Sequence, residues 1–120
     1  MNNSRNDIKS AILNSIAASA IAEGAIGGEI PPPKNLNVSR PGLAIHCLFK
    51  SNLIQTQAEA KKIASQIVLI ANRENAFNFF YALGITISNQ TQYGIEKIYN
   101  CTIYSNEPRS ISDEFFLPPN

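Results

Sequence analysis

The chain has 120 residues, of which 44% are hydrophobic and 16% charged, values that suit one globular domain with a weakly charged surface. Ten basic and nine acidic residues give a net charge of +1, and no basic run resembles those that neutralise DNA phosphates. Sequence-specific binding of nucleic acid is therefore not expected. No stretch approaches the ~20 apolar residues of a membrane span, so no membrane association is expected.

The first predicted element is an amphipathic helix over residues 4–23. Ser4 followed by Asp7 resembles a capping box. One apolar stripe then repeats every four residues, at Ile8, Ile12 and Ile16. Gly24 supplies the expected helix end. The apolar residues of this N-terminal segment are interrupted too often by polar ones for a signal peptide, so the amphipathic helix is the better interpretation.

A proline-rich arm is predicted over residues 31–42, after a short candidate strand at 25–30. Pro31, Pro32 and Pro33 cannot donate backbone hydrogen bonds and favour extended backbone. A connection of this length in a small domain is usually functional or disordered.

An alternating strand is predicted over 43–50, with one apolar face made by Leu43, Ile45, Cys47 and Phe49. A helix over 56–73 follows and is expected to pack on the sheet, because Thr56 and Glu59 form a second capping box ahead of an apolar stripe.

Residues 76–83 fit either a short helix or the lead-in to a strand. Alternation then predicts strands at 84–89 and 95–105, joined as a hairpin by turn-forming residues.

The predicted domain covers residues 1–106, and 107–120 form an extended C-terminal tail. The tail carries three adjacent apolar residues, Phe115, Phe116 and Leu117. They either fold back onto their own domain or dock in a groove of a neighbour. The fold class is α+β, a small and mostly antiparallel sheet with the N-terminal helix and a second helix packed on it.

Residues that could support catalysis are few. His46 is the only histidine, and alternation places it on the strand face opposite Cys47, so these neighbours do not form a dyad. Asp113 and Glu114 are expected either to be solvated by water or to attract a basic partner. The distant Cys47 and Cys101 are expected to be reduced core thiols. No catalytic residue, cofactor or metal site is expected, and an enzyme is disfavoured.

Two segments carry a resemblance to a known family. They are GEIPP at 28–32 and RPGLAI at 40–45, set between an amphipathic helix and an alanine-rich helix. Over residues 4–105 this order resembles phage tail-terminator, or tail-completion, proteins of the minor-capsid type. The chain departs from that pattern in its strand 43–50, which lacks the basic residues often found there, and in its tail, which has no counterpart.

The resemblance implies a non-enzymatic virion protein, assembled in the host cytoplasm. Such proteins form a ring, commonly hexameric, which caps the tail tube and joins it to the head–neck connector. The implied partners are other copies of the chain, the tail-tube protein and the connector protein. The residues expected to contact adjacent subunits are Pro31, Pro32, Pro33, Arg40, Phe115, Phe116 and Leu117. The alternatives are another neck or head-closure protein of the virion, or a small bacterial adaptor or immunity-type binding protein.

Overall fold

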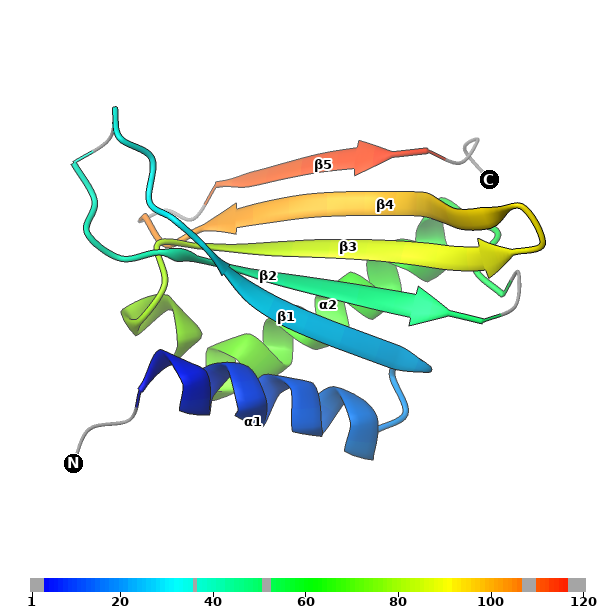
Figure 1. Ribbon diagram of the computed structural model, residues 1–120, viewed down its shortest axis with the longest axis horizontal. Coiled ribbons are helices and arrows are strands. Elements are labelled where there is room, and N and C mark those ends of the chain that lie inside the picture. Colours follow the sequence, from blue (N-terminus) through cyan, green and yellow to red (C-terminus); the bar gives the residue numbers. More distant parts are fainter. Residues whose placement is uncertain (1–3, 36, 51–52, 107–109, 117–120) are drawn as a thin grey trace.

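The protein is described by a computed structural model that covers residues 4–35, 37–50, 53–106 and 110–116. Two helices, α1 and α2, lie against one face of a five-stranded sheet (Figure 1). The strands follow one another in chain order, β1-β2-β3-β4-β5. This architecture confirms the expected α+β class.

Helix α1 spans Arg5–Ala18, and Ser4 and Asp7 form the expected capping box. Its buried face consists of Ile8, Ile12 and Ile16. The prediction that the helix continues to residue 23 is wrong. Ala20 adopts a left-handed conformation with φ of 52°, and the Ile21 N–H donates to the Ile16 carbonyl 3.0 Å away, which closes the helix.

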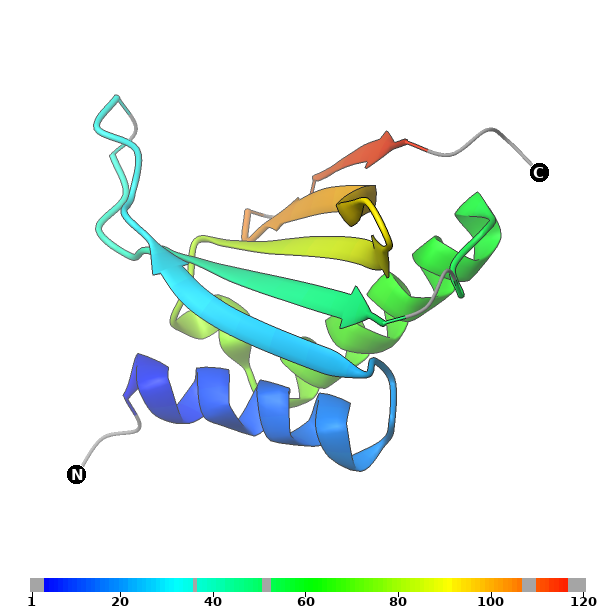
Figure 2. The ribbon, with the colours of Figure 1, turned by 45° about the vertical axis from the view of Figure 1, so that its right-hand side comes forward.

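Strand β1 spans Gly24–Ile30 and pairs antiparallel with β2, Gly42–Phe49, so both predicted strands are confirmed. Gly24 is the first paired residue of β1, so it belongs to the sheet and does not end the helix as the sequence predicted. The arm is therefore the long connection of one antiparallel pair. Figures 1 and 2 both show it standing away from the sheet, beyond the end of β1.

Helix α2 spans Gln57–Arg73 behind the expected Thr56–Glu59 capping box, which confirms this prediction. It links β2 to β3, Ala82–Thr91, and these two strands are parallel. Parallel neighbours need a crossover connection of this kind, whereas hairpins join antiparallel ones. The other three strand pairs are antiparallel.

The ambiguous segment 76–83 contains both alternatives. A short 3-10 helix η1, Ala76–Asn78, is followed by the start of β3. Strand β4, Gly94–Tyr104, pairs antiparallel with β3, which confirms the predicted hairpin. Gly94 has φ of +123°, a conformation that residues with a side chain rarely adopt. The register shifts between Ile87 and Ser88, where a β-bulge interrupts the pairing.

Part of the predicted tail belongs to the sheet. Residues Ile111–Phe115 form β5, an edge strand antiparallel to β4. The alternative in which the tail folds back onto its own domain therefore holds for these residues, and a tail separate from the domain is wrong for them.

The core lies between the sheet and the helices. On β2 and β3 it is built from side chains at alternate positions, which places Leu43, Ile45, Leu83 and Ile85 in one layer. Cys47 and Cys101 are both buried and unpaired, as expected. None of the helices in the described ranges has both the length and the apolar character needed to cross a bilayer.

Candidate assembly surfaces

The base of the arm is held by Arg40. Its Nη1 donates a hydrogen bond of 2.7 Å to the Phe77 carbonyl, and Nη2 donates one of 3.3 Å to Ser105 Oγ. The Tyr81 N–H adds a bond of 3.0 Å to the Pro41 carbonyl. Arg40 was expected to contact an adjacent subunit, and the structure gives it contacts within its own chain. The RPG segment thus fixes where the arm rejoins the sheet.

The three consecutive prolines lie at the other root of the arm, directly after β1. Pro31 is exposed, whereas Pro32 and Pro33 are half-buried. Because one root is stiffened by prolines and the other is anchored by Arg40, the arm is restrained at both ends. Such restraint lowers the entropy lost when a segment binds a partner.

The aromatic residues of the tail occupy different environments. Phe115 is half-buried and packs against Tyr99 of β4, with 4.6 Å between the ring centroids. Phe115 was expected to contact an adjacent subunit, and the structure gives it this contact within its own chain. Phe116 is 50% exposed, and Lys97 Nζ lies 5.6 Å from the centroid of its ring. Leu117 lies outside the described residues.

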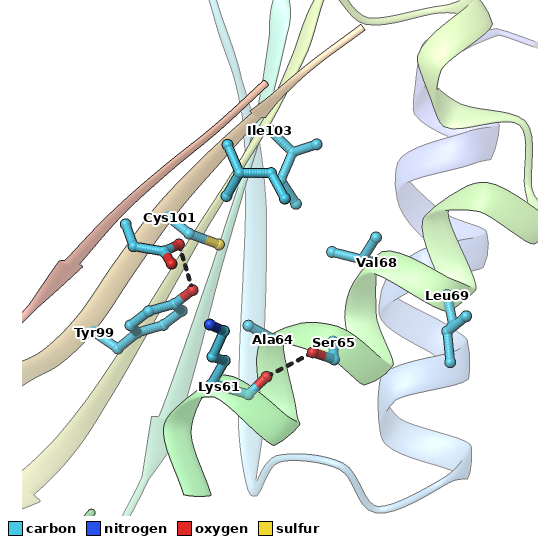
Figure 3. A pocket seen from close by; sticks show the side chains of 10 residues that line it. Lys61, Ala64, Ser65, Val68, Leu69, Tyr99, Cys101 and Ile103 are labelled. Carbon is cyan, nitrogen blue, oxygen red and sulfur yellow. Dashed lines mark hydrogen bonds between the residues drawn. The ribbon is translucent and has the colours of Figure 1, made fainter. Parts of the chain in front are cut away.

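An apolar groove of about 580 Å³ separates α2 from strands β4 and β5. Figure 3 shows Val68 and Leu69 on the helix side and Tyr99, Cys101 and Ile103 on the strand side. Two of its apolar side chains are well exposed, Leu69 at 68% and Ile111 at 65%.

On the strand side of this groove, the Tyr99 hydroxyl donates a hydrogen bond of 2.9 Å to Asp113 (Figure 3). Burial, together with the neighbouring Cys101 and Asp113 side chains, raises the pKa of Tyr99, so the phenol stays protonated and remains a donor. The sequence indicated nothing of this site, because it forms only when the tail joins the sheet.

The sheet face opposite the helices is not covered by any element in the described part of the chain (Figures 1 and 2). One row of paired residues crosses all five strands on this face: Ile26, His46, Thr86, Asn100 and Glu114. Its interior is hydrogen-bonded, since His46 Nε2 lies 2.9 Å from Ser88 Oγ and Thr86 Oγ1 donates a bond of 3.0 Å to Asn100.

Beside this row lies a small apolar pocket of about 180 Å³ between β1, β2 and β4. Its lining includes Ile26, Leu48 and Ile95, and Ile26 is 71% exposed and Ile95 62% exposed. Exposed apolar side chains gathered around a pocket are typical of interaction surfaces.

His46 and Cys47 lie on opposite faces of β2, as alternation predicted. Burial raises the pKa of Cys47 to about 12, so its thiol is not a nucleophile at neutral pH. Among the described residues no three histidine, cysteine or acidic side chains gather as a metal site would require.

No family model, no curated protein and no solved structure matches the chain.

Proposed function

We propose that the chain is a virion assembly protein that terminates a phage tail. In this proposal, copies form a ring at the head-proximal end of the tail tube. One face of the ring binds the tail-tube protein, and the other binds the head–neck connector. The protein then acts through recognition between subunits, without a chemical step. The ring assembles in the host cytoplasm and remains part of the virion.

The observation that carries this proposal is the arm between β1 and β2. Its two roots coincide with the GEIPP and RPGLAI segments on which the resemblance rests. It stands away from the sheet (Figure 2), while Arg40 and the prolines restrain its ends. An ordered base with a projecting tip suits a segment that a neighbouring subunit grips.

The test uses the full-length chain and a tail-tube protein from the same genome. Light scattering after size exclusion and negative-stain microscopy are expected to show rings. Added to polymerising tube protein, the rings should shorten the tubes and appear at one tube end only. Tubes of unchanged length without bound protein would refute the proposal.

A matched pair of variants tests the role of the arm. Lys34→Glu changes an exposed residue on the arm, and Lys62→Glu makes the same charge change on the exposed face of α2. Capping should weaken for the first variant and persist for the second. If both variants cap tubes equally well, the arm does not take part in capping.

The pocket formed by Ile26, Leu48 and Ile95 favours a second candidate, a small adaptor or immunity-type protein that binds one partner through its open sheet face. Such a protein remains a monomer and forms a one-to-one complex. The same light-scattering measurement therefore distinguishes the two functions. Another neck or head-closure role would give rings that bind the connector but leave tube growth unchanged.

A further inference from the structure

Strand β1 is an edge strand without the usual protection against pairing. It contains no lysine, arginine or proline, and its register with β2 has no bulge. Its single charge, Glu29, is paired within the chain to Arg5 at 2.8 Å. Ile26 and Ile30 are 71% and 47% exposed. An edge of this kind readily accepts another strand.

The opposite edge, β5, runs in the direction that fits β1. Strand β2 is antiparallel to β1 and parallel to β3, and β4 and β5 each reverse direction in turn. Strands β1 and β5 are therefore antiparallel to each other. A second copy moved sideways, without being turned over, brings its β1 antiparallel to the β5 of the first copy. Its helices then lie on the same side of the extended sheet.

The helical layer is also incomplete at the β5 edge. Helix α1 packs against β1, and α2 packs against β3 and β4. In Figures 1 and 2, α1 lies at the β1 edge and no helix runs along β5. The apolar groove between α2 and β4–β5 occupies that position. The α1 of an added copy would arrive beside this groove and cover its exposed Leu69 and Ile111 side chains.

The charges at the two edges are complementary. A Cβ atom at Gly27 would lie 3.2 Å from both Lys9 Cγ and Ile45 Cδ1, so the Lys9 side chain lies against the helix-side face of β1. Within the described residues Lys9 has no ion pair with an acid of its own chain. Strand β5 presents Asp113 and Glu114, both exposed. Two β5 edges would repel each other, whereas β1 with Lys9 attracts β5.

We propose that copies of this chain join head to tail through antiparallel pairing of β1 with the β5 of the next copy. The sheet then continues from subunit to subunit, and α1 closes the groove of its neighbour. Such a contact between different surfaces forms a ring if the rotation between copies closes. The inference deepens the proposed function, because it states how the ring subunits join, but its test needs no phage component.

The test is disulfide trapping with the full-length chain. Ile26 and Glu114 lie on the same sheet face at opposite edges, and the native cysteines are buried. Mixing the single variants Ile26→Cys and Glu114→Cys under mild oxidation should give a mixed disulfide dimer. Its yield should exceed that of Ile26→Cys mixed with Lys62→Cys by about tenfold or more, because a formed interface raises the effective concentration. Ser112→Cys lies two residues away on the same face of β5. Used in place of Glu114→Cys, it detects the same pairing with the strands shifted by two residues.

Exchanging the charges at the two edges provides a second, independent test. Lys9→Glu and Asp113→Lys should each reduce the oligomer fraction, and the double variant should restore it, with circular dichroism verifying that each variant folds. A monomer at all concentrations, or disulfides that form mainly between two Ile26→Cys chains, would overturn the inference. Rings that show the mixed disulfide but do not shorten tail tubes would refute the proposed function and leave this inference intact.

Discussion

The aromatic rings of Phe115 and Tyr99 lie 4.6 Å apart between centroids, with 41° between their planes. The two residues face each other across β5 and β4. Tyr99 is only 2% exposed and belongs to the core cluster, so Phe115 covers part of that core. Residues 111–115 therefore stabilise the domain that the sequence assigned to residues 1–106 alone.

Replacing each of the two adjacent phenylalanines with alanine should lower the free energy of unfolding by clearly different amounts. Phe115→Ala should lower the free energy of unfolding by about 1–3 kcal/mol, because it removes a half-buried ring from an aromatic pair. Phe116→Ala should lower it by about 1 kcal/mol or less, since its ring is half exposed and contacts Lys97 at the surface. Urea denaturation of the monomer measures both values. Equal losses would show that the tail is not packed as described.

Arg40→Ala should loosen the base of the arm. Removal of the charged donor to the Phe77 carbonyl should cost about 1.5–3 kcal/mol in the free energy of unfolding. Hydrogen exchange should also quicken at the Tyr81 amide, which donates to the Pro41 carbonyl. Lys34→Ala, at an exposed position of the same arm, is the control and should change neither value. Unchanged exchange at Tyr81 in the Arg40 variant would contradict the anchoring role.

Asn89→Ala should be among the most destabilising polar substitutions. Asn89 is 0% exposed, accepts a hydrogen bond from the Ile54 N–H and donates one of 2.8 Å to the Ile54 carbonyl. The variant deprives both backbone groups of this partner in a buried setting, at roughly 2–4 kcal/mol in total. Gln90→Ala, at the exposed neighbouring position, should change the free energy of unfolding by less than ~0.5 kcal/mol. Thermal and urea denaturation check the comparison.

Stability should fall at alkaline pH through Cys47. Burial raises its pKa from 9.0 to about 12, so between these values the unfolded chain has lost a proton that the folded chain retains. The stabilisation is fully present below pH 9 and is lost as the pH rises toward 12, at up to about 1.4 kcal/mol per pH unit.

The Cys47→Ala variant isolates this contribution, because other groups titrate alkaline as well. The difference in free energy of unfolding between the two proteins should be constant from pH 6 to pH 8 and should shrink at pH 10. A difference that does not depend on pH would show that the Cys47 thiol is accessible to water in the folded protein.

Local signals in the sequence located the helix starts and most strands. The capping boxes at Ser4 and Thr56 act within one helical turn, so they identify a helix start without any tertiary contact. Alternation in 43–50 likewise identified which side chains of β2 point to the core. For the candidate surfaces, the sequence indicated the arm through its prolines, but it did not indicate the groove beside α2.

What the sequence determined by itself was the set of elements and their apolar faces, since periodicity and capping depend on residues a few positions apart. The tertiary structure decided where α1 stops, that β2 and β3 run parallel, and that the tail is a fifth strand. Each of these outcomes depends on pairing between segments that propensity treats separately, such as Ile45 with Ile85 or Ile103 with Ile111. The free energy comes from shared burial and backbone hydrogen bonds across the sheet, which no single segment supplies alone.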